Sequence, residues 1–329
     1  MPDRAATTLE RIESFLPERT VRVDELAESL GLRRAEAGVF RKIYGLDELR
    51  LDPANTLFDL ALPPARRALA ALPEGARVRY VVYAHTIQTL APPDLDPARM
   101  IRDALGLHEA EAFAVSQQAC VSSLGAIDAV AELLRAETDE TDRADGPDGP
   151  SRAYALMVTG ERAFSPTVQL IPNTAVMADA GAACLLTVGG PGDIVRSYVT
   201  RTLGEYAAGL RLTKEETREY GAVYAQALAG VMRGAVAEAG LDFSGIEMII
   251  PHNVNLISWR GVIKEMGLDP DRVFLENVPR YSHCYASDNF VNYVTLRDSG
   301  RLVDGADYLF VSVGLGATLG AMVVRHRRR

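Results

Sequence analysis

Two stretches of this chain repeat one order of features, and this internal repeat constrains the fold more than any other property of the sequence. Residues 78–85 and 246–252 are both apolar runs that end in a histidine. Each is followed by a helical pattern, a short apolar run, a turn with a cysteine (Cys120 or Cys284), another helical pattern and a run that enters a glycine-containing segment. Two copies of one mixed unit predict two central sheets packed around shared helices, with equivalent loops that converge on one site.

Short apolar runs alternate with amphipathic stretches along the chain, which is typical of an α/β protein. After Cys120, apolar residues recur at spacings of three or four and predict a helix of about four turns that begins at the cysteine. Residues 137–151 are rich in acidic residues, proline and glycine, so we expect a surface insertion there. The apolar helix positions are Leu124, Ile127, Val130 and Leu134, and strands are predicted at residues 78–83, 112–115, 153–158, 182–187, 248–250, 309–313 and 321–324.

The composition excludes several classes of protein. The chain has 329 residues, of which 48% are hydrophobic, so it has enough apolar residues for a large buried core. Its net charge of -9 argues against nucleic acid as a main partner, and the basic run at residues 325–329 is interpreted as a solvated tail. No signal peptide is recognised, and no segment approaches the roughly 20 apolar residues of a membrane span. We therefore expect a soluble cytoplasmic protein that binds neither nucleic acid nor membrane.

The three cysteines are too few for a disulfide framework or a zinc site of paired CxxC type, and no metal site is expected. Cys120 opens a predicted helix, where the partial positive charge of the helix N terminus favours a thiolate nucleophile. Position alone leaves a buried small hydrophobe equally open. Cys184 lies inside an apolar run and is assigned to the core, whereas Cys284, beside His283, is expected to line the site.

Residues far from Cys120 in the chain supply the other groups that acyl transfer through a thioester requires. His252 follows an apolar strand and is a candidate donor or base. Glycine allows the chain to approach a thioester closely, so the backbone amides of Cys120 and Gly316 are predicted to form an oxyanion hole. Asn255 is either a residue that orients the site or the N-cap of the next helix, and the two interpretations stay equally open. His85 is expected to be structural.

The order of these motifs resembles the β-ketoacyl-acyl-carrier-protein synthase III family of the thiolase fold. The resemblance rests on Cys120, His252, residues 280–283 and residues 313–320, with residues 41–46 near the start where the family typically has an arginine-threonine-glycine-isoleucine turn. It implies a homodimer, an acyl-enzyme on the cysteine, and acyl donors carried on coenzyme A or an acyl carrier protein. No permanently bound cofactor is implied.

The resemblance also implies a five-layered, duplicated α/β fold with two pseudo-symmetric halves. Residues 1–190 would form the N-terminal half, which carries the nucleophile and the acidic insertion at 137–151. Residues 191–329 would form the C-terminal half, with the two histidines and the glycine turn.

The chain departs from the family at His283, where the family usually has asparagine. Neutral histidine accepts a proton and asparagine does not, so this position suits an acceptor that loses a proton as it attacks. Asp288 would orient His283, or would be an ordinary carboxylate at a helix N terminus. Ile257 stands where the family commonly has an arginine that helps to dock the carrier protein, and the family's coenzyme-stacking tryptophan is absent near Val39.

These residues and the resemblance predict a homodimeric acyltransferase with a ping-pong mechanism. Cys120 would take the acyl group from the donor and pass it to a small hydroxyl or amine acceptor in specialised metabolism. His252 and His283 would handle protons and charge. Two alternatives stay open. The first is decarboxylative Claisen condensation with a malonyl thioester, and the second is a non-catalytic partner subunit of a condensing enzyme.

Overall fold

The computed structural model describes residues 5–141 and 152–328, and nine of the described strands form one sheet. The strand order is β11-β12-β13-β10-β1-β9-β6-β4-β5. Strands β4, β5 and β6 run parallel to one another, as do β11 and β12, while the other neighbours are antiparallel. The parallel pairs place the carboxyl ends of β4 and β6 at one edge of the sheet and those of β11 and β12 at another. Residues that follow these strand ends in both halves form the site.

The two halves of the chain repeat one order of elements, as the sequence predicts. The first copy consists of β1 (Thr7–Phe15), α2 (Leu57–Leu69), β4 (Arg77–Ala84), α3 (Pro97–Ala104), β5 (Glu111–Val115), the 3₁₀ turn η1 (Ala119–Val121), α4 (Ser122–Thr141), β6 (Ala153–Glu161) and β9 (Ala180–Val188). The second consists of β10 (Asp193–Thr202), α6 (Lys214–Glu238), β11 (Ile246–Pro251), α7 (Leu256–Met266), the 3₁₀ turn η6 (Tyr285–Ser287), α9 (Asp288–Asp298), β12 (Asp307–Gly314) and β13 (Thr318–Arg325).

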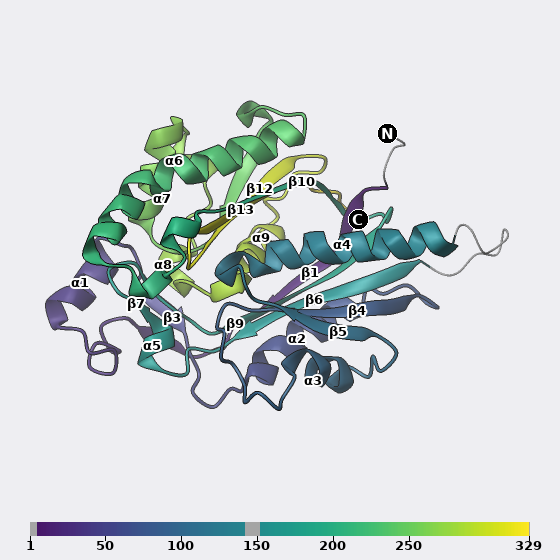
Figure 1. Cartoon of the computed structure of the whole chain (residues 1–329), viewed down its shortest axis with the longest axis horizontal. Helices are drawn as coiled ribbons and strands as arrows, with labels where there is room; N and C mark the ends of the chain where they lie inside the picture. Colours follow the sequence, from purple (N-terminus) through teal and green to yellow (C-terminus); the bar gives the residue numbers. More distant parts are fainter. Residues whose placement is uncertain (1–4, 142–151, 329) are drawn as a thin grey trace.

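Alternation of side chains across the strands produces the layers. In β4, Val81 and Tyr83 pack with α2 and α3, whereas Tyr80 and Val82 pack with α4 on the opposite face. In the second copy the outer faces of β12 and β13 pack against α6 and α7, and their inner faces pack against α9. Figure 1 shows α2 and α3 on one side, α6 and α7 on the other, and α4 between them. The result is the five-layered arrangement of the thiolase fold.

The sequence predicted two central sheets, but the described strands are continuous. Strands β1 and β10 pair at Thr8 with Ile194 and at Leu9 with Asp193. An edge strand leaves backbone donors and acceptors unpaired, and this short antiparallel contact satisfies some of them where the halves meet. The halves are therefore joined edge to edge as well as through the helices between them.

Helix α4 also differs from the prediction, because it continues past residue 137 to Thr141. Glu137 is held there by Arg79, at 3.0 Å, and by the hydroxyl of Tyr80, at 2.6 Å. These contacts come from the neighbouring strand β4, so local composition did not reveal them. The rest of the expected insertion, residues 142–151, lies outside the described residues.

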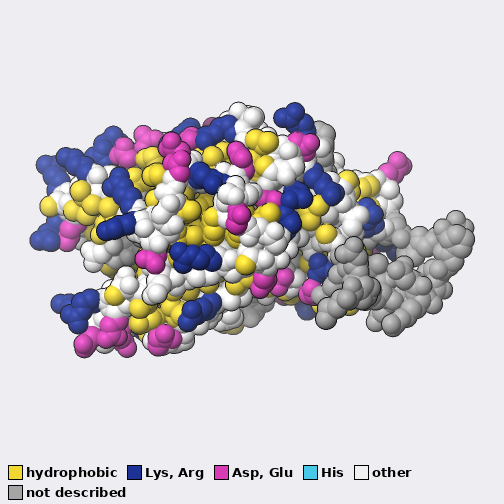
Figure 2. Space-filling model, turned by 90° about the horizontal axis from the view of Figure 1, so that it is seen from above, with side chains coloured by type: hydrophobic (Ala, Val, Ile, Leu, Met, Phe, Trp, Pro, Cys, Tyr) yellow, Lys and Arg dark blue, Asp and Glu magenta, His cyan; other side chains and the backbone are white. Residues whose placement is uncertain are grey.

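Smaller elements connect these strands and helices. They are β2 (Thr20–Arg22), α1 (Arg34–Lys42), β3 (Glu48–Arg50), α5 (Pro166–Gln169), β7 (Leu170–Ile171), β8 (Ala175–Val176), α8 (Val278–Tyr281) and the 3₁₀ turns η2 (Gly204–Tyr206), η3 (Gly209–Arg211), η4 (Phe243–Gly245) and η5 (Pro270–Arg272). On the face seen in Figure 2, acidic and basic side chains are interspersed with apolar ones. Within the described residues, no helix has the length and apolar character needed to cross a membrane.

Candidate active site

The candidate nucleophile, Cys120, lies in the tight turn η1 directly before α4 and is 3% exposed. The residue before it, Ala119, has a left-handed φ of 49°, which an alanine adopts only at a cost in free energy. Gly314 at the end of β12 packs against this turn, since a Cβ there would lie 2.1 Å from the carbonyl oxygen of Gln118. The hydroxyl of Ser312 donates to the carbonyl of Cys120 at 2.9 Å. The second copy therefore fixes the turn that carries the sulfur.

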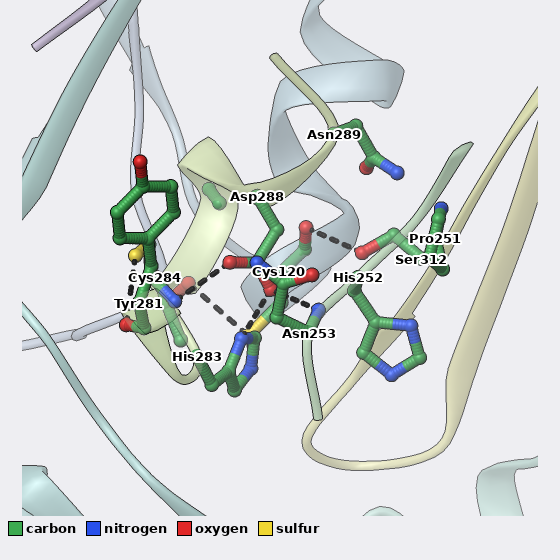
Figure 3. A network of polar contacts seen from close by, with 12 residues as sticks. Cys120, Pro251, His252, Asn253, Tyr281, His283, Cys284, Asp288, Asn289 and Ser312 are labelled. Atoms are coloured by element: carbon green, nitrogen blue, oxygen red, sulfur yellow. Dashed lines mark hydrogen bonds and ion pairs between the residues drawn. The ribbon is translucent and has the colours of Figure 1, made fainter. Parts of the chain in front are cut away.

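His283 reaches the sulfur from the opposite half of the molecule. Its Nε2 lies 3.4 Å from Sγ of Cys120, and its Nδ1 lies 2.5 Å from Oδ2 of Asp288. The dashed lines in Figure 3 trace both contacts. The backbone of His283 is itself held, because its amide donates to the carbonyl of Val176 and its carbonyl accepts from the amide of Ala178. The imidazole is thus placed between a sulfur and a carboxylate.

Asp288 combines both roles that the sequence left open. It is the first residue of α9, and its carboxylate accepts backbone amides from Cys284 at 2.7 Å and from Asn253 at 2.6 Å. It also accepts from Nδ1 of His283, and its side chain is 1% exposed. A carboxylate with three hydrogen-bond donors at a helix N terminus suits the role of partner to an imidazolium.

The buried charges around His283 favour its protonated form. Burial alone would disfavour the charge, but the Asp288 carboxylate and the Cys120 sulfur outweigh it and raise the pKa of His283 to about 10. At neutral pH an imidazolium therefore lies beside the sulfur. That arrangement stabilises a thiolate on Cys120 as its ion pair.

The second imidazole, His252, follows β11 and is 1% exposed. Its amide donates to Val311, and its carbonyl accepts from the indole of Trp259 at 2.9 Å. Its ring centroid lies 5.9 Å from that of His283. Burial, reinforced by the neighbouring His283, lowers the pKa of His252 well below its usual range. One ring of the pair is therefore neutral and the other charged, which gives them different chemistry.

Comparisons with known proteins point to one family. The model of the family described as 3-oxoacyl-[acyl-carrier-protein (ACP)] synthase III C terminal matches residues 236–326. The β-ketoacyl-[acyl-carrier-protein] synthase III of Bordetella petrii is 26% identical over 332 residues, which cover 95% of each chain. The chain is therefore similar to the β-ketoacyl-acyl-carrier-protein synthase III family, in its C-terminal part by the family model and over nearly its whole length by the Bordetella petrii relative.

Solved structures show that this synthase III-like chain has the thiolase fold. The structure of 3-oxoacyl-(acyl carrier protein) synthase III from Pseudomonas aeruginosa PAO1 aligns with a TM-score of 0.77 at 20% identity, over 98% of this chain and 99% of that one. ChlB3, described as an acyltransferase, aligns with a TM-score of 0.81 at 20% identity over 98% of each chain. At this identity the alignments show the fold, and together with the sequence comparisons they support an enzyme of the synthase III and thiolase type.

Asn255 and Cys284 were also expected at the site, and both make contacts that hold the backbone near it. Asn255 is the N-cap of α7: its side chain accepts from the amide of Ser258 at 2.7 Å and donates to the carbonyl of Thr174 at 2.9 Å. Cys284 contributes its backbone amide to Asp288, but its side chain packs in an apolar cluster. Burial, with the neighbouring Asp288 carboxylate, raises the pKa of the Cys284 thiol, so this side chain contacts a site residue from the core side. The expectation that it lines the site stays a prediction. Cys184 lies in the core as expected and is fully buried.

The repeat itself pairs different residues from those the sequence suggested. Turn η6 starts at Tyr285, which has a left-handed φ of 52° as Ala119 does in η1. When the two turns are matched at these positions, the counterpart of Cys120 is Ala286 and not Cys284. The second turn therefore keeps the backbone shape of the first without the nucleophile. It supplies the histidine and the aspartate on either side instead.

The predicted oxyanion hole stays a prediction for Gly316, which lies in the turn between β12 and β13 with a φ of 92°. Only glycine adopts such a backbone without strain. Sequence reasoning missed Thr86, whose hydroxyl lies 3.5 Å from Sγ of Cys120, and Glu161, whose carboxylate accepts the backbone amide of Thr86. Glu161 is a carboxylate at the end of an otherwise apolar strand, and that polar ending was the one available signal.

Proposed function

We propose that this protein is an acyltransferase that moves an acyl group from a carrier thioester to a small hydroxyl or amine acceptor through an acyl-Cys120 intermediate. The observation that carries the proposal is the line of contacts from Cys120 through His283 to Asp288. A nucleophile, a base and a carboxylate that orients the base are the parts that transfer to a protic acceptor requires. The donor would be an acyl carrier protein or coenzyme A.

In the first half-reaction the thiolate of Cys120 attacks the carbonyl carbon of the thioester. The bond from that carbon to the carrier sulfur breaks, and the imidazolium of His283 gives its proton to the departing carrier thiolate. The products are acyl-Cys120, a free carrier thiol and a neutral His283. Asp288 keeps Nε2 directed at the reacting sulfur, since its own contact fixes Nδ1.

In the second half-reaction the neutral Nε2 of His283 takes the proton from the acceptor hydroxyl or amine as the acceptor attacks the acyl carbon. The bond to Cys120 then breaks, and the ion pair between the thiolate and the imidazolium returns. An asparagine at this position has no basic nitrogen, so it cannot perform this step. Acyl transfer therefore uses His283 as a general base, a role that condensation does not require.

His252 would act in both half-reactions as a neutral hydrogen-bond donor toward the carbonyl oxygen of the thioester. Its low pKa suits that role, because a neutral imidazole does not compete with His283 for the thiolate. The backbone amides of Cys120 and Gly316 would supply the other donors. Negative charge develops on that oxygen in the tetrahedral intermediate, so fixed donors lower the barrier.

Decarboxylative condensation with a malonyl thioester is the second candidate function. Two imidazoles with ring centroids 5.9 Å apart could both donate to an enolate, and the Bordetella petrii relative bears the name of a condensing enzyme. A non-catalytic partner subunit is the third candidate. The contact between Cys120 and His283 argues against it, because a subunit without chemistry has no use for a thiol held beside an imidazole.

His283→Asn separates the first two functions. In an acyltransferase, transfer from acyl-Cys120 to hydroxyl and amine acceptors should fall by roughly 10²–10⁴, as expected for removal of a general base. In a condensing enzyme, asparagine should replace histidine well and release of carbon dioxide from malonyl thioesters should persist. Single-turnover acylation, acceptor transfer and carbon dioxide release are measured for the parent and the variant.

Measurements on the parent protein decide between acyl transfer and condensation. Carbon dioxide release coupled to a β-keto product, retained in His283→Asn, would refute the acyltransferase proposal. Glu276→Gln provides a matched control, because that carboxylate pairs with Arg301 on the surface. It should behave as the parent does in all three measurements.

A homodimer is part of this proposal. Strand β5 is the last strand of the sheet, so its outer edge has no described strand beside it. A second copy that pairs along this edge would satisfy its free backbone groups. Sedimentation equilibrium tests this point, and a monomer at micromolar concentration would contradict it.

A further inference from the structure

Glu161 at the end of β6 connects loops from both halves of the molecule beside the active site. Its Oε1 accepts backbone amides from Thr86 at 2.6 Å and from Ile87 at 2.9 Å. Its Oε2 accepts the amide of Ala286 at 3.4 Å. Thr86 and Ile87 follow β4 in the first copy, and Ala286 is the counterpart of Cys120 in the second. One carboxylate therefore holds two turns that lie next to the reactive sulfur.

Thr86 links this carboxylate to the nucleophile. Its hydroxyl donates toward Sγ of Cys120 at 3.5 Å, which is within hydrogen-bonding distance for sulfur. The backbone amide of the same residue is held by Glu161. The position of the hydroxyl therefore depends on the carboxylate. A donor at this distance stabilises a thiolate more than a thiol, because hydrogen bonds to charged acceptors are the stronger ones.

The surroundings of Glu161 make its charge costly. The side chain is fully buried, and no ion pair with Lys, Arg or His involves it in the part of the chain that the structure describes. The titratable groups that face it are the phenols of Tyr83 on β4 and Tyr285 in η6, with Cys120 beyond Thr86. Burial raises the pKa of Glu161 to about 7, although the amides that it accepts oppose that rise.

We propose that Glu161 is a positioning residue for Cys120: its carboxylate fixes Thr86 so that the Thr86 hydroxyl stabilises the thiolate. This inference rests on the proposed function, in which that thiolate is the nucleophile. Nothing in the acyl-transfer steps above uses Glu161, so its burial without a cation needs a separate explanation. Stabilisation of the sulfur through Thr86 provides one.

Protonation should weaken this effect. A protonated carboxyl carries a hydrogen on one oxygen, and an oxygen with a hydrogen is a poorer acceptor for the amides that now point at it. The loop with Thr86 would then be held less firmly, and the thiolate would lose part of its stabilisation. The reactivity of Cys120 should therefore include a change near neutral pH that belongs to Glu161, in addition to the ionisation of the pair formed with His283.

Alkylation by iodoacetamide tests the proposal without any acyl donor. The rate of single carbamidomethylation at Cys120 is followed by intact mass and peptide mapping from about pH 5 to about pH 9, because this reagent reads the thiolate. We expect the parent to show the change near pH 7 and Glu161→Gln to lack it. Thr86→Val should react about tenfold more slowly, the size expected for a lost hydrogen bond to a charged group. Thr86→Ser should recover most of the rate.

The controls distinguish the possible failures. Cys120→Ala gives the background from the other cysteines, and Glu276→Gln should follow the parent. If Thr86→Val and Glu161→Gln are alkylated as the parent is at every pH, the proposal is wrong. If Glu161→Gln does not fold, the comparison of Thr86→Val with Thr86→Ser decides alone. A parent that shows the expected alkylation profile but transfers no acyl group would overturn the proposed function and leave this inference intact.

Discussion

The carboxylate of Asp288 contacts Nδ1 of His283 at 2.5 Å while it also accepts two backbone amides at the start of α9. This relationship is the reason that the buried imidazole holds a proton. Without the negative charge, burial would dominate and the pKa of His283 would fall. The helix start thus fixes the charge, the orientation and the tautomer of the base together.

Asp288→Asn should therefore slow acyl transfer by roughly 10²–10⁴, because the amide supplies neither the charge nor a fixed tautomer. The pH profile of Cys120 alkylation should shift as well, since the imidazolium beside the sulfur is lost at a lower pH. Asp298→Asn at the other end of α9 is the matched control, because that carboxylate is exposed. Transfer at the parent rate by Asp288→Asn, with an unchanged pH profile, would show that the contact has no catalytic role.

Acyl thioesters should add one acyl group to the protein, and the group should map to Cys120. The reason is that this sulfur lies beside an imidazolium, whereas Cys184 and Cys284 are buried in apolar clusters. Intact mass followed by peptide mapping measures the adduct. Cys284→Ala should still be acylated. A stable adduct of the same mass on Cys120→Ala would mean that the nucleophile lies elsewhere.

Gly314→Ala should disrupt the site through its backbone. The added Cβ would lie 2.1 Å from the carbonyl oxygen of Gln118, so the turn before Cys120 has to move. We expect a loss of about 1–3 kcal/mol in the free energy of unfolding and a larger loss of acylation. Gly261→Ala in α7 meets open space and should instead be neutral or stabilising by up to about 1 kcal/mol. Denaturant unfolding and single-turnover acylation measure both effects, and equal stability of the two variants would contradict this account.

Glu161 should reduce stability as the pH rises. Its pKa is about 7 in the folded protein and near 4.5 when exposed, so the folded state binds the proton more tightly across that window. The protonated carboxyl stabilises the folded state fully below the pKa of the exposed group. This stabilisation is lost as the pH rises through the pKa of Glu161 in the folded protein. Relative to the parent, Glu161→Gln should gain about 3 kcal/mol across the window, at 1.36 kcal/mol for each pKa unit. A pH-independent difference in unfolding free energy between the two proteins would show that the pKa of Glu161 is not raised.

Much of the architecture could be predicted from the sequence because the strands carry apolar residues on both faces and the order of elements repeats. Residues 78–83 and 309–313 lie within observed strands for this reason. The continuity of the sheet could not be predicted, since it depends on pairing between Thr8 and Ile194, which are distant in the chain. Local patterns do not encode contacts of that range.

The candidate site was predictable where sequence neighbours are also spatial neighbours, as with His283 and Asp288. Adjacency alone did not show that the thiol of Cys284 would be buried on the core side of the site, because it does not say to which side a tight turn directs each side chain. Glu161 was missed for the converse reason. Its partners Thr86 and Ala286 lie 75 and 125 residues away in the chain, and no motif joins them.

The sulfur of Cys120 belongs to one half of the sheet and the imidazole of His283 to the other, across a distance of 3.4 Å. The distance between Sγ and Nε2 therefore depends directly on the relative position of the two halves. A displacement of about 1 Å would hardly change the secondary structure, yet it would separate the ion pair and cost much of the rate. Thiol reactivity in this protein therefore reports on the alignment of its two copies, and a substitution far from the site can be recognised by its effect on one cysteine.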